Sequence, residues 1–473
     1  MAQSFEVGLI QQTPIPDLTS ASTATLATLA RRAWSLKRSL DIVTQTSHAF
    51  VLPALLQVNR SSLSDCSLSR LAKAWTDHVT AVELELAHIQ TQIDDLVFDL
   101  YGISEEVGSG QQAAGSNPPL ELPTANRLLP ANPPTDDDEE DSSNAADLPS
   151  LTSELLAYLL SVAFGRFDVR LATGDRSHPP EPEPFDPLPV CSPGMLVSDN
   201  GLPAIAPTEL PPDYPIQIPF DGILVDDEGH SNDMINRIRE VLNVIWGEQD
   251  SDIEQEACHL LSTNGLRVSS LRDYFRKPTA FFNNHLSRYS KSRRQAPIYL
   301  PLSTRSGNYT LWLYYHRLTD QTLYTCINDY VEPKLNRVSE TVSSLRNKTG
   351  RSRDEEKLLE DLQDLESELE DFRDALQRIA QFWKPNLNDG VQITLSPLWS
   401  LFRLGKWQKK LKETWDKLEK GDYDWAHLAH SIWAKRVEEK CKKDKSLAIA
   451  HNLEHLYETP PETPKSTKRK KKE

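Results

Sequence analysis

Several features that would narrow the function at once are scarce or absent in this sequence. The 473 residues include only five cysteines, which are widely separated and form no C-x-x-C pair. The thiols are therefore predicted to be reduced and unpaired. The longest nearly unbroken apolar run, residues 155–165, is far shorter than the ~20 residues that a membrane-spanning helix needs. The first 30 residues lack a basic start followed by an apolar stretch, which predicts no signal peptide and a cytoplasmic location.

Glycine-rich nucleotide-binding motifs are also missing. No G-x-x-x-x-G-K-[ST] sequence occurs, and no glycine-rich loop between a strand and a helix could hold S-adenosylmethionine. Residues 117–119 and 132–134 read Asn-Pro-Pro, as at the start of the N-P-P-aromatic motif of amino-methyltransferases. Leu120 and Thr135 follow them, in place of the ring that stacks on a flipped base. We therefore predict no catalytic residue and no cofactor site in this chain.

Histidine pairs at helical spacing do not predict a metal site. His427 and His430 are three residues apart, and His451 and His455 are four apart. Neither pair has a nearby cysteine or a glutamate in H-E-x-x-H register, so a structural or surface role is favoured over zinc binding.

A carboxylate and lysine trio near the C-terminal end resembles one used by nucleases. It consists of Asp424, Glu438 and Lys440. Such sites usually lie on strands, whereas residues 437–445 have the pattern of the charged end of a helix. The sequence therefore favours a solvated face here.

The charge that is present is mostly acidic, and it is unevenly distributed. The chain has 52 Lys and Arg against 69 Asp and Glu, a net charge of −17. Residues 276–319 nevertheless contain eight basic residues, no acidic residue and several aromatic ones. Cationic side chains neutralise phosphates and aromatic rings stack on bases, so this span predicts a DNA-binding surface. Its candidate contacts are Arg288, Tyr289, Lys291, Arg293, Arg294, Arg305, Trp312 and Arg317. In the alternative that stays open, the aromatic residues fill a core and the arginines pair with acids elsewhere.

Helical periodicity is strong in three places. Apolar residues recur at alternating spacings of four and three from Trp75 to Leu100, which predicts a long helix over 69–101 ending at Gly102. Residues 23–40 show helical spacing and are its nearest candidate partner. Two further seams, Val331 to Leu345 and Leu358 to Ile379, flank a turn at 347–353. They predict an antiparallel coiled-coil hairpin, or alternatively two ordinary helices on a globular core.

The fold class predicted is mainly α with smaller α+β parts. Residues 296–302 and 309–315 have strand composition around a Ser-Gly-Asn turn, which predicts a basic β-hairpin. A further short strand is predicted over 217–225, and helices at 232–247, 253–261 and 269–275. The predicted organisation is long helices in 1–103, a disordered acidic and proline-containing linker at 104–150, and an α+β region at 151–330 with a proline-rich insert at 179–219. A coiled-coil hairpin at 331–382, a helical region at 383–458 and a basic disordered tail at 459–473 complete it.

Several segments together resemble one known family. They are residues 5–16, 93–102, 159–167, 296–299, 422–427 and 446–451. In this order they resemble the C-terminal half of the PglX-type adenine-specific DNA methyltransferases of BREX phage-defence systems, and of the related type IIG restriction-modification enzymes. The likeness extends over nearly all of residues 5–457.

The resemblance implies a function that is divided between two parts. In that family an N-terminal domain binds S-adenosylmethionine and methylates adenine N6, while the C-terminal half carries target-recognition lobes joined by long helices. This chain begins within what looks like the end of a recognition lobe. The catalytic part is therefore expected on a separate subunit encoded by a split gene, or in a missing N-terminal half.

The resemblance leads to one main hypothesis and two alternatives. The main hypothesis is a DNA-binding and assembly portion of an N6-adenine methyltransferase, with double-stranded DNA, the catalytic part and other defence proteins as partners and no membrane. The first alternative is a protein-interaction scaffold that does not contact DNA. An autonomous methyltransferase is the least favoured.

Overall fold

The structure of the chain is a computed structural model that describes residues 16, 18–58, 67–102, 147–262, 267–291 and 294–458. The predicted linker up to residue 146, the predicted basic tail and Arg293 lie outside the described residues. The described chain is mainly helical with a small antiparallel sheet, which confirms the predicted fold class. Its internal contacts divide it into a first unit, residues 1–155 with 170–194, and a second unit, residues 156–169 with 195–473. The domain boundaries drawn from the sequence stay predictions.

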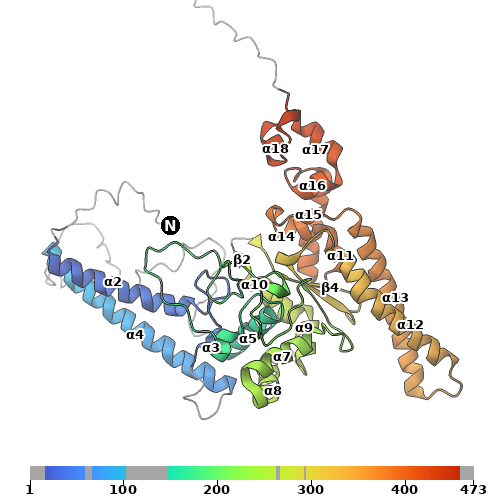
Figure 1. Cartoon of the computed structure of the whole chain (residues 1–473), viewed down its shortest axis with the longest axis horizontal. Coiled ribbons are helices and arrows are strands. Elements are labelled where there is room, and N and C mark those ends of the chain that lie inside the picture. Colours follow the sequence, from blue (N-terminus) through green and yellow to red (C-terminus); the bar gives the residue numbers. More distant parts are fainter. Residues whose placement is uncertain are drawn as a thin grey trace, which may run out of the picture. The chain divides into compact units, whose positions relative to one another are not determined.

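Two long helices form most of the first unit. Helix α2, Ser20–Asp41, begins after Thr19, whose side chain caps the first turn by accepting the Ser22 N–H. Helix α4, Leu68–Tyr101, ends at Gly102, which has the left-handed φ of 63° that favours glycine at a helix end. The two helices lie side by side (Figure 1) and share a buried cluster of Leu36, Val82 and Ile89. The helix predicted over 69–101 and its partner over 23–40 are thus confirmed.

The first unit also contains short helices and an extended segment. Helices α3, Ala54–Gln57, and α6, Arg170–Thr173, are four residues each. Residues 174–194 have no helix or strand. In the second unit, the rest of the predicted proline-rich insert contains the short 3-10 turn Pro207–Glu209 and isolated β-bridges at Met195 and between Val197 and Pro203. Proline supplies no N–H for helices or ladders, which is why this insert is irregular.

A small sheet lies at the centre of the second unit. Strand β4, Tyr299–Ser303, and strand β5, Thr310–Tyr314, form the predicted hairpin, and β1, Ile223–Val225, pairs antiparallel with β5 on its other side. Strand β5 is buried along its whole length, and Trp312 is only 1% exposed. On the same sheet the ring of Phe164 stacks on that of Tyr299 at a centroid distance of 5.1 Å. The sheet is therefore packed on both faces and leaves no aromatic surface of β5 to solvent.

Helices and one further ribbon surround this sheet. Helix α5 spans Leu148–Ala163 and so begins within the last residues of the predicted linker. The helices that follow are α7 Met234–Trp246, α8 Asp250–Leu261, α9 Leu271–Arg276, α10 Asn283–Arg288 and α11 Thr322–Thr325. Strands β2, Ser290–Lys291, and β3, Arg294–Gln295, form a separate two-stranded ribbon after α10. The helices predicted over 232–247, 253–261 and 269–275 are confirmed, with small shifts of their ends.

A helical hairpin follows, formed by α12, Glu332–Asn347, and α13, Arg353–Ala380 (Figure 1). The turn between them has Gly350 at φ 73°, and α13 begins at a capping box in which Ser352 and Glu355 exchange hydrogen bonds. The half of α13 nearer its C-terminal end is buried at Leu369, whereas Leu358 is 47% exposed. The two helices pack along each other as predicted, while a coiled-coil geometry stays a prediction.

The last part of the second unit is helical. Its helices are α14 Val391–Leu395, α15 Gly405–Lys420, α16 His427–Ile432, α17 Ala434–Cys441 and α18 Lys445–Ala450. Helix α15 ends at Gly421, whose φ of 88° is again left-handed. Trp407 and Leu411 anchor α15 in the core, because both side chains are 0% exposed.

Candidate nucleic-acid interface

Acidic residues of the loop after β1 form ion pairs that neutralise part of the basic span. Asp226, at 3% side-chain exposure, pairs with both Arg272 and Arg276, and Asp233, at 0%, accepts a bidentate contact from Arg272. Asp226 and Arg276 are 50 residues apart in the sequence, and their atoms are 2.7 Å apart. Arg276 is therefore neutralised inside the fold and is not available to a phosphate.

A third aspartate of this loop is held by the helical hairpin. Lys334 and Arg337 on α12 reach Asp227 at 2.8 and 2.7 Å. Burial alone would raise the pKa of Asp227, but the two cations outweigh burial and hold this pKa below its ordinary value. The loop thus joins β1 to α12 through charged contacts.

The β2–β3 ribbon presents the basic residues that remain. Lys291 stands opposite Arg294 in the ribbon, and both side chains are exposed. Arg288, one turn earlier at the end of α10, is half-buried. Within the described part of the chain, none of these three cations forms an ion pair with a carboxylate, and the Nη1 of Arg288 has no hydrogen-bond partner. Closely spaced cations without internal partners are the arrangement that phosphate binding needs.

Buried groups fix the base of this ribbon. The Tyr289 hydroxyl accepts a hydrogen bond from the buried guanidinium of Arg166, and the Tyr289 carbonyl accepts the Ala296 N–H at 2.9 Å. Burial opposes the charge of Arg166, but the phenolic groups of Tyr289, Tyr299 and Tyr314 outweigh it and raise the pKa of the guanidinium. The ribbon is therefore attached to the core at both of its ends.

A buried histidine completes this base. His285 is 1% exposed, and its Nε2 accepts the backbone N–H groups of Ile298 and Tyr299 at 3.0 and 3.1 Å. Burial, together with the charges of Arg288 and Arg166, holds the pKa of His285 well below its ordinary value. The imidazole is therefore neutral, and it acts as an acceptor that fixes the start of β4.

Helix α15 adds a second group of cations beside the ribbon. The Lys410 ammonium donates to the Gln295 side chain at 3.1 Å, and Gln392 Nε2 donates to the Gln295 carbonyl at 3.3 Å. Lys406 and Lys409, on the same first turns of α15, are exposed. These lysines are not among the contacts predicted from the sequence, because acids later in the helix cancel their charge when it is summed over a long stretch. Summed over residues 405–412 alone, the charge is clearly positive, since these residues contain four lysines and no acid.

The remaining predicted contacts are used inside the fold or stand apart from the ribbon. Arg317 donates to the carbonyls of Pro219 and Ala204 and covers the ring of Phe220. Arg305 is 92% exposed, with Nε 3.9 Å from a Glu368 carboxylate oxygen. Trp312 lies in the core of the sheet, as the alternative interpretation of the basic span has it, and Arg293 lies outside the described residues. The structure thus gathers Arg288, Tyr289, Lys291 and Arg294, and their role in DNA binding stays a prediction.

The nuclease-like trio is solvated at Glu438 and Lys440, whose side chains are 45% and 47% exposed, but not at Asp424. Asp424 is 4% exposed, because Arg436 and Lys440 pair with it at 2.6 and 2.5 Å and close it off from solvent. The expected solvated face is thus wrong for Asp424. Glu438 lies 3.8 Å from His430 instead. Within the described ranges, no group of three or more His, Cys, Asp or Glu side chains is arranged to hold a metal ion.

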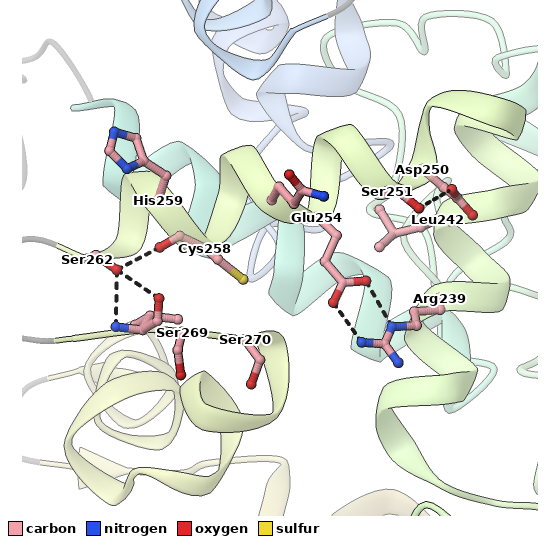
Figure 2. A pocket seen from close by; sticks show the side chains of 12 residues that line it. Arg239, Leu242, Asp250, Ser251, Glu254, Cys258, His259, Ser262, Ser269 and Ser270 are labelled. Atoms are coloured by element: carbon pink, nitrogen blue, oxygen red, sulfur yellow. Dashed lines mark hydrogen bonds and ion pairs between the residues drawn. The ribbon is translucent and has the colours of Figure 1, made fainter.

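A cavity of about 560 Å³ lies between α7, α8 and residues 268–270 (Figure 2). Arg239 and Glu254 form a bidentate ion pair in its wall. Cys258 is its only thiol, and burial raises the pKa of this thiol to about 11. A protonated thiol is a poor nucleophile, so Cys258 is not an activated attacking group.

One described loop can be compared with the glycine-rich loops that bind methyl donors. The loop after β1, residues 226–233, is the one place where a strand of the described sheet leads directly into a long helix. It contains a single glycine, and its three aspartates form ion pairs with arginine and lysine side chains.

Among the helices that the structure describes, none is long and apolar enough to cross a membrane.

Fold and surface together describe a mainly helical protein with a small antiparallel sheet and a cationic ribbon. No family model matches the chain. The chain is similar to the adenine-specific methyltransferase BrxX of Escherichia coli O9:H4 (strain HS), with 27% identity over 192 residues. The match covers 37% of this chain and 15% of that protein, so it indicates a relationship to a BREX-type methyltransferase over a part of each.

Proposed function

We propose that this chain is a DNA-binding and assembly part of an adenine-specific methyltransferase system of the BREX type. The similarity to BrxX supports the class of system. The cationic ribbon supports DNA contact, since Lys291 and Arg294 stay exposed and without carboxylate partners among the described residues of a chain with net charge −17. This second observation carries the proposal.

The ribbon and α15 together would contact the phosphates of double-stranded DNA. Lys410 joins the two elements through Gln295, so Lys406 and Lys409 extend the cationic surface beyond the ribbon. Phosphate contacts position a protein on DNA but carry no sequence information. The proposed role of this surface is therefore to hold the duplex, while base recognition belongs to other residues.

The test is the salt dependence of DNA binding by the double variant Lys291→Ala/Arg294→Ala. Each lost phosphate contact lowers the magnitude of the negative slope of log K against log salt by about 0.9, so this magnitude should fall by roughly 1.8 in the double variant. Its affinity should fall for all duplex sequences alike. Fluorescence anisotropy with two unrelated duplexes of about 30 base pairs, between about 50 and 200 mM salt, measures both effects.

A matched control separates this surface from net charge. Arg353→Ala/Lys357→Ala removes the same charge from two exposed residues of α13. This variant should keep the slope of the unaltered chain. Equal slopes for the ribbon variant and the unaltered chain, or equal losses in both variants, contradict the proposal.

Methyl transfer would then belong to another part of the system. We propose that S-adenosylmethionine binds a separate catalytic part, a division supported by the single glycine and the paired aspartates of the loop after β1. Labelled methyl transfer to DNA should appear only when that part is added. Methylation by the purified chain alone would overturn this division.

A scaffold that does not contact DNA is the second candidate function, and one observation favours it. The exposed face of α13 is strongly acidic, with Asp354, Glu356, Glu360, Asp361 and Asp364 all exposed. This face repels phosphates. It leaves Leu358 47% exposed, and an exposed apolar side chain on such a face could pack against the helix of a partner protein. Binding of catalytic or other defence proteins without retardation of duplex DNA would favour this candidate.

A further inference from the structure

The first unit contains an irregular segment whose apolar side chains are exposed. This segment, the proline strap, comprises residues 179–193, of which seven are proline. It lies outside the DNA interface proposed above, and the inference drawn from it is independent of that proposal.

The proline strap is attached to the unit at both ends. Near its start Glu183 pairs with Arg31 of α2, and Glu181 accepts a hydrogen bond from Ser35 at 3.1 Å. Just after its end, the Gly194 N–H donates to the Phe50 carbonyl at 2.8 Å. A Cβ at Gly194 would lie 2.4 Å from the Val51 carbonyl oxygen, so only glycine permits this approach. These contacts hold the two ends of the strap in fixed places.

Between the anchors, three large apolar side chains face solvent. Phe185 is 98% exposed, Val190 is 85% exposed and Leu188 is 73% exposed. Single exposed apolar residues are ordinary, but three within six positions of one extended segment are a concentrated patch. None of the three side chains contributes to the core of the unit, so a partner could bury their apolar surfaces.

The conformation of the segment lowers the entropic cost of binding. Alternating prolines restrict φ to about −65° and favour an extended polyproline conformation. Asp186 accepts the Glu183 N–H at 2.8 Å and donates its own N–H to the Glu183 carbonyl at 3.0 Å, so Phe185 lies in a fixed turn of the strap. A segment whose backbone is already restricted loses little freedom when it binds.

Charge decides which class of partner fits. The proline strap contains Glu181, Glu183 and Asp186 and no basic residue. Nucleic acids and anionic membranes would be repelled by these carboxylates. Proteins recognise proline-rich segments in grooves lined by aromatic side chains, and basic residues at the rim of such a groove would complement the acids.

We propose that the proline strap is a docking segment for a protein with an apolar groove and a basic rim, and that Phe185 and Leu188 fill its pockets. The partner binds the strap with the turn at Phe185 retained. The proposal requires no change in the rest of the first unit.

The test begins with a photo-crosslinking amino acid, p-benzoylphenylalanine, in place of Phe185 in the full chain, expressed in the organism that carries its gene. The same amino acid at Trp425, a 47% exposed residue of the second unit, is the control. A protein that is crosslinked only from position 185 is then purified. Its binding to the purified full chain is measured by calorimetry.

The expected result is a direct interaction that Phe185→Ser and Leu188→Ser each weaken by about tenfold or more, as for an anchor in a pocket. Affinity should also fall several-fold between about 50 and 200 mM salt because of the acidic flanks. Phe185 is almost fully exposed, so its replacement cannot unfold the protein and lost binding would report on contact. The proposal is overturned if position 185 gives no protein adduct beyond the control, or an adduct with a second copy of this chain or with nucleic acid. Equal binding of Phe185→Ser by the purified partner overturns it as well.

Discussion

Replacement of Arg272 by methionine should destabilise the second unit strongly. Arg272 is 14% exposed and contacts two buried carboxylates, Asp226 at 3% and Asp233 at 0% exposure, besides the exposed Glu228. Removal of one partner from a buried pair costs about 3–5 kcal/mol, because the other charge is left unpaired away from water. Asp226 keeps Arg276, whereas Asp233 loses its only cationic contact among the described residues and keeps only the N–H groups of neighbouring residues. The loss should therefore lie at the lower end of this range, near ~3 kcal/mol.

The measurement is thermal unfolding of the full chain by calorimetry. For a unit of this size, 1 kcal/mol shifts Tm by roughly 2–4 °C, so Arg272→Met should lower Tm by about 6–12 °C. Arg239→Met is the matched control, since the pair of Arg239 with Glu254 has side-chain exposures of 48% and 17%. Exposed pairs contribute about 1 kcal/mol or less, which predicts a shift of at most a few degrees.

A second variant tests the physical reason for the loss. Asp233→Asn in the Arg272→Met background removes the unpaired charge and keeps an acceptor for the backbone N–H groups, so part of the lost stability should return. Equal shifts for Arg272→Met and Arg239→Met, or a further loss in the double variant, would refute the reasoning.

Three further predictions follow from burial and charge. The pKa of Asp227 is held below its ordinary value, so its ion pairs stabilise the fold fully above about pH 4 and less as pH falls through the lowered pKa. Urea unfolding should show a gap between Asp227→Asn and the unaltered chain at about pH 7 that closes towards about pH 2, and a gap that is constant with pH would contradict this. Gly194→Ala should cost the first unit about 1–3 kcal/mol in urea unfolding, because its methyl group would strike the Val51 carbonyl, whereas an unchanged midpoint would exclude the clash. Leu369→Ala, at a 0% exposed position of α13, should cost about 2–5 kcal/mol while Leu358→Ala costs under ~1, and similar losses would argue against the described packing.

The similarity to BrxX and the proposed DNA role rest on different observations. The sequence match connects the chain with a methyltransferase but covers a small part of that protein. The cationic surface is a property of this fold, formed by the ribbon and α15. DNA-binding measurements on the ribbon variants therefore test the role of the surface without reference to the relative.

Local patterns in the sequence are enough to predict most of the elements. The heptad spacing from Trp75 to Leu100 and the glycine after it define α4, and the Ser-Gly-Asn turn defines the β4–β5 hairpin. Helices and tight turns depend on side chains within a few residues of one another, so a linear pattern can reveal them. The acid-free basic span is likewise visible in the order of charged residues alone.

Only the tertiary structure decided which charged and aromatic residues stay on the surface. Arg276 and Lys291 look alike in the sequence, yet one is neutralised by Asp226 and the other remains exposed. Trp312 is buried because the rings of Phe275 and Phe281 pack against it, and Asp424 is buried because Arg436 and Lys440 close over it. Exposure and ion pairing depend on contacts between residues that are distant along the chain. A one-dimensional pattern contains the charges of these residues but not their partners.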